Sequence, residues 1–145
     1  MKENGRNLQL EKDLQGILDN GDNVWVIGDV HGFSKTLRQL ITKLTLSPED
    51  SVVILGDLID RGPNSFDIVQ FVKQSENIYS LKGNHEKMMI ELLTTSALES
   101  PDYHLMNWLR VGGLATVTSY INAYTDDNGI EDSKALDNII NYDRK

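Results

Sequence analysis

The most informative stretch of the chain is VVILGDLIDRGP, from Val52 to Pro63. Its first four residues are apolar and three of them are β-branched, which predicts a strand buried on both faces, as in a parallel sheet. Gly-Asp and Asp-Arg-Gly-Pro follow, so two carboxylates and a guanidinium lie in the loop after this strand. Open α/β sheets bind their ligands at this end of the strands. The stretch therefore predicts the centre of a functional site.

Two further apolar runs predict strands of the same kind. Residues 24–27 precede the loop Gly-Asp-Val-His-Gly, and residues 78–81 precede Lys-Gly-Asn-His-Glu. Helical spacing of apolar residues predicts helices at 34–44, with Ser34 as its cap, at 64–74 and at 86–96. Strand, loop and helix thus recur three times, which predicts the α/β class and a mostly parallel sheet with right-handed crossovers.

Further helices are predicted outside this repeated pattern. They cover residues 8–19, 103–110, 114–123 and 133–142, with a break at Gly112-Gly113 and a loop at 125–129. We expect one domain over residues 1–145: an N-terminal helical extension at 1–22, a motif-bearing core at 24–97, and a helical segment at 102–142.

Each of the three strands ends in a loop with metal-binding side chains. The loops offer, in chain order, Asp29 and His31, then Asp57 and Asp60, then Asn84, His85 and Glu86. Parallel strands place these loops at one edge of the sheet, and such oxygen and nitrogen donors suit Mn²⁺, Fe or Zn²⁺. The middle loop could supply Asp57 as a bridge between two ions. Two ions ~3.5–4 Å apart would activate a water as hydroxide and clamp an in-line phosphoryl displacement.

Each motif also has a simpler interpretation. Gly-Asp after a strand is usually a turn, and Asp-Arg-Gly is most often a solvated loop. Asn-His-Glu is often only a helix start, in which Glu86 would be a first-turn charge. Three such loops in order, each after a buried strand, favour the functional interpretation.

Composition limits the classes of protein to which the chain can belong. Its 145 residues, 39% hydrophobic and 25% charged, are typical of one soluble globular domain. A net charge of -8 argues against a non-specific nucleic-acid binder. The absence of cysteine excludes disulfides and thiolate-bound zinc and fits a reducing compartment. No run resembles a signal peptide or the ~18 apolar residues of a membrane span, so we expect a cytoplasmic protein without membrane partners.

Three motifs resemble the signatures of the calcineurin-like metallophosphoesterases. GDVHG at 28–32, GDLIDRG at 56–62 and GNHE at 83–86 resemble GD-x-HG, GD-x-x-DRG and GNHE. The chain is most similar to the phosphoprotein phosphatase branch, including bacterial and phage serine/threonine phosphatases. Trp108, Gly112, Gly113 and Thr116 also resemble a W-x-x-x-GG-x-x-T feature of those members. The likeness covers about residues 24–120 and implies the N-terminal portion of a β-sandwich flanked by helices.

The resemblance also implies roles for individual residues. The implied metal ligands are Asp29, His31, Asp57 as the bridge, and Asn84. The cofactor would be a divalent metal, Mn²⁺ first and Fe or Zn²⁺ as alternatives, with two ions in a complete family member.

The remaining implied roles concern proton transfer and phosphate binding. His85 would be the general acid, oriented by Asp60, because a carboxylate partner fixes the tautomer of an imidazole. Arg61 would bind two phosphate oxygens with its planar fork, and Asn84 would also contact the phosphate.

The chain departs from the family pattern after the GNHE motif. Family members have two further metal-binding histidines, whereas the third and last histidine of this chain is His104, which we expect to be exposed or capping. We therefore expect a chain truncated at its C-terminus, without the second sheet of the sandwich. Asp57 and Asn84 alone would hold a second ion weakly, so we expect a mononuclear metal site.

Three functions remain open at this stage. The first is a phosphoric monoester hydrolase, in particular a protein serine/threonine phosphatase acting on phosphoproteins or small phosphoesters. The second is a symmetrical bis(5'-nucleosyl)-tetraphosphatase. The motifs of that group resemble GD-x-x-ARG and GNHD, whereas this chain has Asp60 in place of the alanine and Glu86 in place of the last aspartate, which favours the first function. The third is a catalytically incomplete fragment that binds one metal ion or acts as an interaction module.

Overall fold

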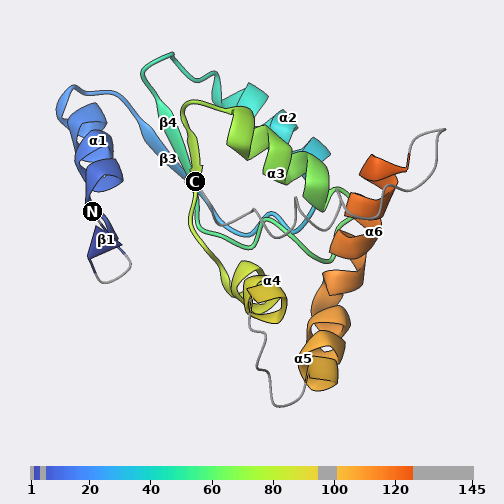
Figure 1. Ribbon diagram of the computed structural model, residues 1–145. Coiled ribbons are helices and arrows are strands. Elements are labelled where there is room, and N and C mark those ends of the chain that lie inside the picture. Colours follow the sequence, from blue (N-terminus) through green and yellow to red (C-terminus); the bar gives the residue numbers. More distant parts are fainter. Residues whose placement is uncertain (1, 4–5, 95–100, 126–145) are drawn as a thin grey trace.

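The computed structural model describes residues 2–3, 6–94 and 101–125. Its centre is a parallel sheet in the order β3–β4–β5 (Figure 1). These strands are β3 (Val24–Ile27), β4 (Ser51–Ile54) and β5 (Ile78–Ser80). Ile27 pairs with Ile54, and Ile54 pairs with Ser80, so the three strands end at the same level. The predicted α/β class and parallel sheet are confirmed, and the three motif-bearing loops leave the sheet along one edge.

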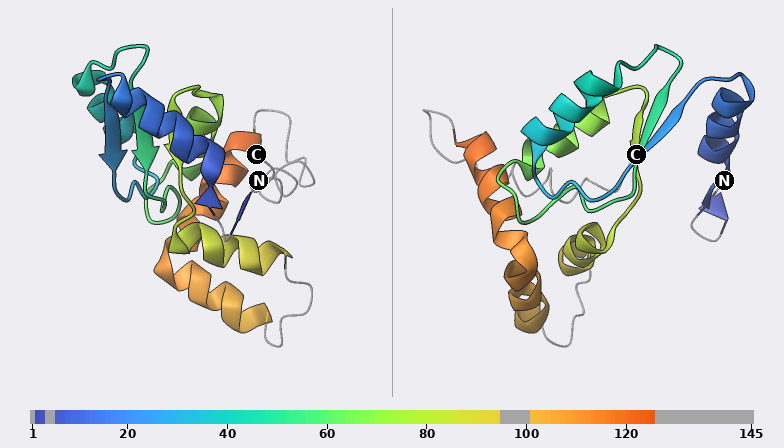
Figure 2. Two further views of the ribbon diagram at one scale, coloured as in Figure 1. Left: turned by 90° about the vertical axis from the view of Figure 1, so that its left-hand side faces the viewer. Right: turned by 180° about the vertical axis from the view of Figure 1, so that it is seen from behind.

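Helices cover one side of the sheet and continue beyond its functional edge. α2 (Ser34–Leu44) and α3 (Ser65–Gln74) lie side by side over the sheet (Figures 1 and 2). α4 (Asn84–Thr94) follows β5, and α5 (Pro101–Trp108), the π-helical turn η1 (Leu109–Gly113) and α6 (Leu114–Tyr124) lead back to α3. α1 (Leu8–Asp19) lies next to β3, after a small hairpin of β1 (Lys2–Glu3) and β2 (Arg6–Asn7). None of the described helices has both the length and the apolar character needed to cross a membrane.

The hydrophobic core is built around the central strand β4. All four residues of β4 are buried, because this strand pairs on both sides and is covered by helices. Buried side chains from α2, α3, α4 and the loop after β4 pack against it, namely Leu37, Ile68, Val69, Met89, Leu58 and Ile59. The loop that carries Asp57 and Asp60 is therefore part of the core and not a solvated turn.

The strand β3 is less buried than its apolar sequence predicts. It lies at the edge of the described sheet, and the exposed fractions are 37% for Trp25 and 61% for Val26. The other two strands end one residue earlier than predicted, so that Leu55 and Leu81 are also exposed. Apolar composition alone does not show how many sides of a strand are covered, which is why the prediction of a buried strand is wrong for β3.

Several helix boundaries also differ from the prediction. Ser34 is the buried first residue of α2 and not its cap, a position that Phe33 takes without a side-chain hydrogen bond. α4 begins at Asn84, two residues before the predicted start, and α5 begins at Pro101. The predicted helix at 133–142 and most of the loop at 125–129 lie outside the described residues. The hairpin β1–β2 was not predicted, because two-residue strands have no readable periodicity.

The buried residue Asp50 links the starts of the three strands, at the edge opposite the motif-bearing loops. Asp50, just before β4, accepts hydrogen bonds from the backbone N–H of Asn23 (2.8 Å) and Ser47 (3.0 Å). The backbone carbonyl oxygen of Asp50 accepts a further hydrogen bond from the side-chain amide of Asn77 (2.9 Å), which precedes β5. The hydrogen bonds from the N–H groups of Asn23 and Ser47 lower the pKa of the Asp50 carboxyl.

Asp50→Asn is expected to lower thermal stability at neutral pH. Because the pKa of Asp50 is lowered on folding, its contribution is present above the unfolded-state pKa of about 3.9 and is lost as the pH falls through the lower folded-state value. The difference in Tm between wild type and Asp50→Asn should therefore narrow between pH 5 and pH 2, as measured by circular dichroism. Glu49→Gln, at the exposed neighbouring position, serves as the control. A difference that stays constant down to pH 2 would contradict this role.

Candidate active site

Backbone hydrogen bonds hold the loop after β3 against the loop after β4. The N–H groups of Val30 and His31 both donate to the carbonyl of Asp57, at 3.1 and 2.8 Å. The N–H of Gly62 donates back to the carbonyl of His31 at 2.9 Å. The loop that carries the first motif is thereby fixed on the loop that carries the second.

The backbone of these loops is unusually strained. His31, Asp57, Asp60 and Arg61 have positive φ angles of 46°, 51°, 72° and 64°. Side chains other than glycine rarely adopt this conformation, and such residues cluster at functional sites. At Gly56, where φ is +98°, an added Cβ would lie 2.4 Å from the backbone nitrogen of Gly83, so the loops approach too closely for any side chain. The strained backbone conformations thus occur at residues of the first two motifs.

His31 presents a bare nitrogen to this cluster. Its Nδ1 lies 2.9 Å from the carbonyl oxygen of Ile59, which can only accept, so Nδ1 carries a proton and Nε2 faces away from that carbonyl. Nε2 is buried, has no hydrogen-bond partner, and lies 3.5 Å from Oδ2 of Asp29. One ligand atom each of His31, Asp57 and His85 lies within 4.8 Å of the others. An imidazole oriented in this way beside the carboxylates of Asp29 and Asp57 is a donor set that fits a divalent cation.

Asn84, the fourth predicted ligand, is the exposed first residue of α4. The backbone N–H of its neighbour His85 donates to Oδ1 of Asp57 at 3.0 Å, which ties the start of α4 to the middle loop. The structure thus brings His31 and Asp57 together, with Asp29 next to His31, and places Asn84 at the open side of the third loop.

Asp60 and His85 form a buried pair. Nδ1 of His85 lies 2.6 Å from Oδ2 of Asp60, and the exposed fractions of the two residues are 2% and 0%. A guanidinium nitrogen of Arg61 lies 3.2 Å from Nε2 of His85. Because arginine only donates, Nε2 is the acceptor in this arrangement and Nδ1 carries the proton shared with Asp60. Arg61 is exposed, so its fork is available to a ligand.

The downstream tryptophan, glycine and threonine motif docks on this pair. Nε1 of Trp108 donates to Oδ2 of Asp60 at 2.9 Å, and Oγ1 of Thr116 donates to Oδ1 at 2.6 Å. The carbonyl of Gly112 accepts from the N–H of Arg61 at 3.1 Å. Gly112 has φ +120°, and an added Cβ there would lie 2.7 Å from the nitrogen of Arg61. The sequence predicts no role for this motif, and these contacts show that it binds the Asp60–Arg61 loop.

Glu86 has a larger part in the site than a first-turn charge. Its side chain is fully buried and accepts hydrogen bonds from four backbone N–H groups: Asp57 (2.8 Å), Leu58 (2.8 Å), Ile59 (3.3 Å) and Gly83 (2.9 Å). The bond to Gly83 is that of a capping box, in which a glutamate at the third helical position reaches back to the cap residue. The three-residue spacing of Gly83 and Glu86 is the sequence pattern that could have predicted this capping bond. No sequence pattern indicates the hydrogen bonds between Glu86 and the Asp57 loop.

Glu86→Gln is expected to destabilise the fold by about 2 kcal/mol. The amide keeps one acceptor oxygen but turns an NH₂ group toward buried N–H donors, and each unsatisfied buried donor costs roughly 1–3 kcal/mol. Glu91→Gln is the matched control, because Glu91 lies on the same helix but is exposed and pairs only loosely with Lys87 (3.7 Å). Urea unfolding of both variants measures the difference. Equal stabilities would show that Glu86 does not hold the loop.

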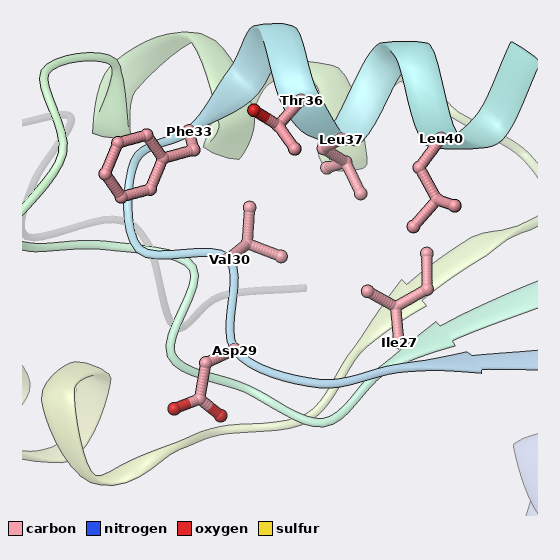
Figure 3. A pocket seen from close by; sticks show the side chains of 7 residues that line it. All are labelled: Ile27, Asp29, Val30, Phe33, Thr36, Leu37 and Leu40. Carbon is pink, nitrogen blue, oxygen red and sulfur yellow. The ribbon is translucent and has the colours of Figure 1, made fainter.

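Two other features near the motifs lie outside this cluster. His104 is exposed on α5, as expected, with its ring 5.7 Å from that of Tyr103. A pocket of about 200 Å³ lies between β3 and α2, lined by Ile27, Asp29, Val30, Phe33, Thr36, Leu37 and Leu40. Figure 3 shows that the Asp29 carboxylate points away from α2 and from the apolar side chains of this pocket. The pocket is therefore separate from the side of Asp29 that offers a ligand.

Comparison with known proteins shows which family the sequence matches. Residues 23–145 match the model of the calcineurin-like phosphoesterase family. Serine/threonine-protein phosphatase 2 of Escherichia coli K12 is 33% identical over 121 residues, which are 83% of this chain and 48% of that protein. The symmetrical bis(5'-nucleosyl)-tetraphosphatase of Shigella dysenteriae is 35% identical over 100 residues, 59% of this chain and 36% of that protein.

A solved structure is also similar. It is a protein serine/threonine phosphatase from Saccharomyces cerevisiae with similarity to human phosphatase PP5, at 29% identity and a TM-score of 0.39, covering 43% of this chain and 22% of that one. The chain spans half or less of the length of each of these relatives. The family match, however, extends over most of the chain. The chain therefore belongs to the calcineurin-like phosphoesterase family.

Proposed function

We propose that this protein is a divalent-metal-dependent phosphoester hydrolase that acts on phosphomonoesters, in particular on phosphoserine or phosphothreonine in proteins. The observation that carries the proposal is the buried, unpartnered Nε2 of His31 beside Asp29 and Asp57. A buried polar atom without a partner is rare unless a ligand supplies one. The family uses divalent metal ions, and these residues have the donor atoms that such an ion needs.

Asp29, His31 and Asp57 would hold one ion, whereas Asp57 and Asn84 alone would hold a second ion only weakly, so we propose a single tightly bound ion. We propose Mn²⁺ as the ion, because mixed carboxylate and imidazole donors suit it. When bound, the ion supplies Lewis acidity and lowers the pKa of water. The chain's own contribution is orientation, since the bond from Nδ1 of His31 to the Ile59 carbonyl directs Nε2 toward the cluster.

The other residues of the site would serve the phosphate and the leaving group. Arg61 would bind two phosphate oxygens with the planar fork of its guanidinium, and Asn84 would also contact the phosphate. When Arg61 turns to the phosphate, Nε2 of His85 loses its contact with the guanidinium. Nε2 of His85, once free, would take up a proton from solvent and then donate it to the leaving oxygen, while Asp60 holds the proton on Nδ1. We treat residues 1–145 as one domain, because Trp108, Gly112 and Thr116 contact the Asp60–Arg61 loop of the core.

A second candidate is the hydrolysis of dinucleoside tetraphosphates. It is supported by the similarity to the symmetrical bis(5'-nucleosyl)-tetraphosphatase. The residue types Asp60 and Glu86 support a phosphatase, because the motifs of the nucleotide hydrolases resemble GD-x-x-ARG and GNHD, with alanine and aspartate at these two positions. The lack of cysteine suits a reducing compartment, so we also propose a cytoplasmic location.

A substrate panel tests the proposal. Phosphate release from p-nitrophenyl phosphate, a phosphoserine peptide and diadenosine tetraphosphate is measured with Mn²⁺ and with EDTA. We expect Mn²⁺-dependent release from the first two and little from the third. Preferential cleavage of diadenosine tetraphosphate would favour the second candidate, and no metal-dependent release from any substrate would support a non-catalytic metal-binding or interaction module.

A further inference from the structure

Asp60 is more firmly held than an orienting partner of a histidine requires. Its carboxylate is fully buried and receives three side-chain donors: Nδ1 of His85 (2.6 Å) and Nε1 of Trp108 (2.9 Å) on Oδ2, and Oγ1 of Thr116 (2.6 Å) on Oδ1. A single bond to His85 would leave the carboxylate free to rotate about χ2. Trp108 and Thr116, which come from a separate segment of the chain, donate to the two carboxylate oxygens of Asp60 and prevent this rotation.

The hydroxyl of Thr116 binds both the side chain and the backbone of Asp60. Besides donating to Oδ1, it accepts the N–H of Asp60 at 2.8 Å and lies 3.1 Å from Oγ of Ser65. Its exposed fraction is 0%, so water does not replace these bonds. Asp60 has a positive φ of 72°, a strained conformation that needs support from its surroundings. Thr116 thus fixes Asp60 at both ends.

Trp108 is held in place by its own neighbour in the motif. An added Cβ at Gly113 would lie 2.5 Å from the indole ring, so only glycine allows the ring to pack there. Trp108 is 4% exposed, and its one polar side-chain atom, Nε1, donates its hydrogen bond to Asp60. Residues 108–116 therefore form a clamp, in which the side chains of Trp108 and Thr116 both bind the Asp60 carboxylate.

We propose that Thr116 and Trp108 are positioning residues that aim His85 through Asp60. This inference rests on the proposed function, in which Nε2 of His85 takes up a proton from solvent and passes it to the leaving oxygen as the phosphorus–oxygen bond breaks and its electron pair moves to that oxygen. With the clamp intact, Asp60 keeps one orientation, and Nε2 of His85 points steadily at the leaving group. Without it, Asp60 rotates, His85 turns with it, and proton donation falls while phosphate binding at Arg61 continues.

Leaving-group dependence separates this role from a purely structural one. Phenyl phosphate has a poor leaving group and needs the proton, whereas 2,4-dinitrophenyl phosphate has a good one and does not. Thr116→Val is expected to lower kcat for phenyl phosphate by roughly 10- to 100-fold, a part of the usual worth of a general acid. KM and the dinitrophenyl reaction should change by less than about 3-fold. Thr116→Ser, which keeps the hydroxyl, should restore most of the activity.

Tryptophan offers a matched pair of variants. Trp108→Phe removes the indole N–H and should show the same selective loss, whereas Trp25→Phe, at the exposed edge strand β3, should not. Equal losses for both esters in Thr116→Val, or no rescue by Thr116→Ser, would overturn the inference.

A spectroscopic measurement keeps the test independent of turnover. Proton–nitrogen correlation spectra should show one Nδ1-protonated tautomer of His85 in wild type and Thr116→Ser, and loss or exchange broadening of its Nδ1–H signal in Thr116→Val. If wild type hydrolyses neither ester, the proposed function fails, and the spectra alone decide whether the clamp orients His85. An unchanged His85 signal in Thr116→Val would overturn the inference.

Discussion

Asp57→Asn is expected to abolish metal-dependent phosphoester hydrolysis, leaving only the rate of the EDTA-treated protein. Asp57 lies in the middle loop, where its carboxylate is close to His31 and His85. Replacing it by an amide removes the negative charge that attracts the cation, and loss of a direct ligand should weaken Mn²⁺ binding by more than about 100-fold, the upper end of what supporting contacts contribute. Turnover of p-nitrophenyl phosphate and calorimetric Mn²⁺ titration measure the two effects.

The substitution suits the backbone at this position. Asp57 has φ +51°, a conformation that asparagine tolerates better than most residues, and an amide oxygen can still accept the N–H of His85. We therefore expect a Tm close to that of the wild type, so that the loss is chemical. Asp67→Asn, which breaks an exposed ion pair with Arg38, is the control. Retained hydrolysis in Asp57→Asn would remove Asp57 from the metal site.

His85→Asn is expected to lower kcat by roughly 10²- to 10⁴-fold for a phosphoserine peptide, the usual contribution of a general acid. The effect on 2,4-dinitrophenyl phosphate should be much smaller, because that leaving group departs without a proton. His104→Asn is the matched control, since His104 is exposed on α5. The measurement is kcat for both substrates in both variants. Intact activity of His85→Asn on the peptide would show that another group donates the proton.

The sequence predicted the parallel sheet and the meeting of its three loops because both depend on local patterns. Apolar runs of four residues marked the strands to within one residue, and the Gly-Asp and Gly-Asn motifs marked the loops that follow them. The common level of Ile27, Ile54 and Ser80 follows from parallel pairing, which is a general property of such sheets. The α/β class and the edge of the sheet that carries the site were therefore predictable.

Long-range contacts were not predictable in the same way. Glu86 reads as an ordinary first-turn charge, because nothing in its neighbourhood shows that it accepts N–H groups from residues 57–59. Thr116 is separated from Asp60 by 56 positions, and no periodicity connects a threonine on one helix with a carboxylate in a distant loop. The exposure of Val26 likewise depends on what pairs with β3 and not on its side chain. Contacts of this kind appear only when the fold brings the segments together.

Calorimetric titration of the EDTA-treated protein with Mn²⁺ tests the central claim, that the three loops build a divalent-metal site. We predict one tight site per chain, with binding lost in His31→Asn, which removes the buried Nε2 beside Asp29 and Asp57. Absence of binding, or binding that His31→Asn leaves unchanged, would contradict the claim. Two tight sites would contradict the single-ion proposal.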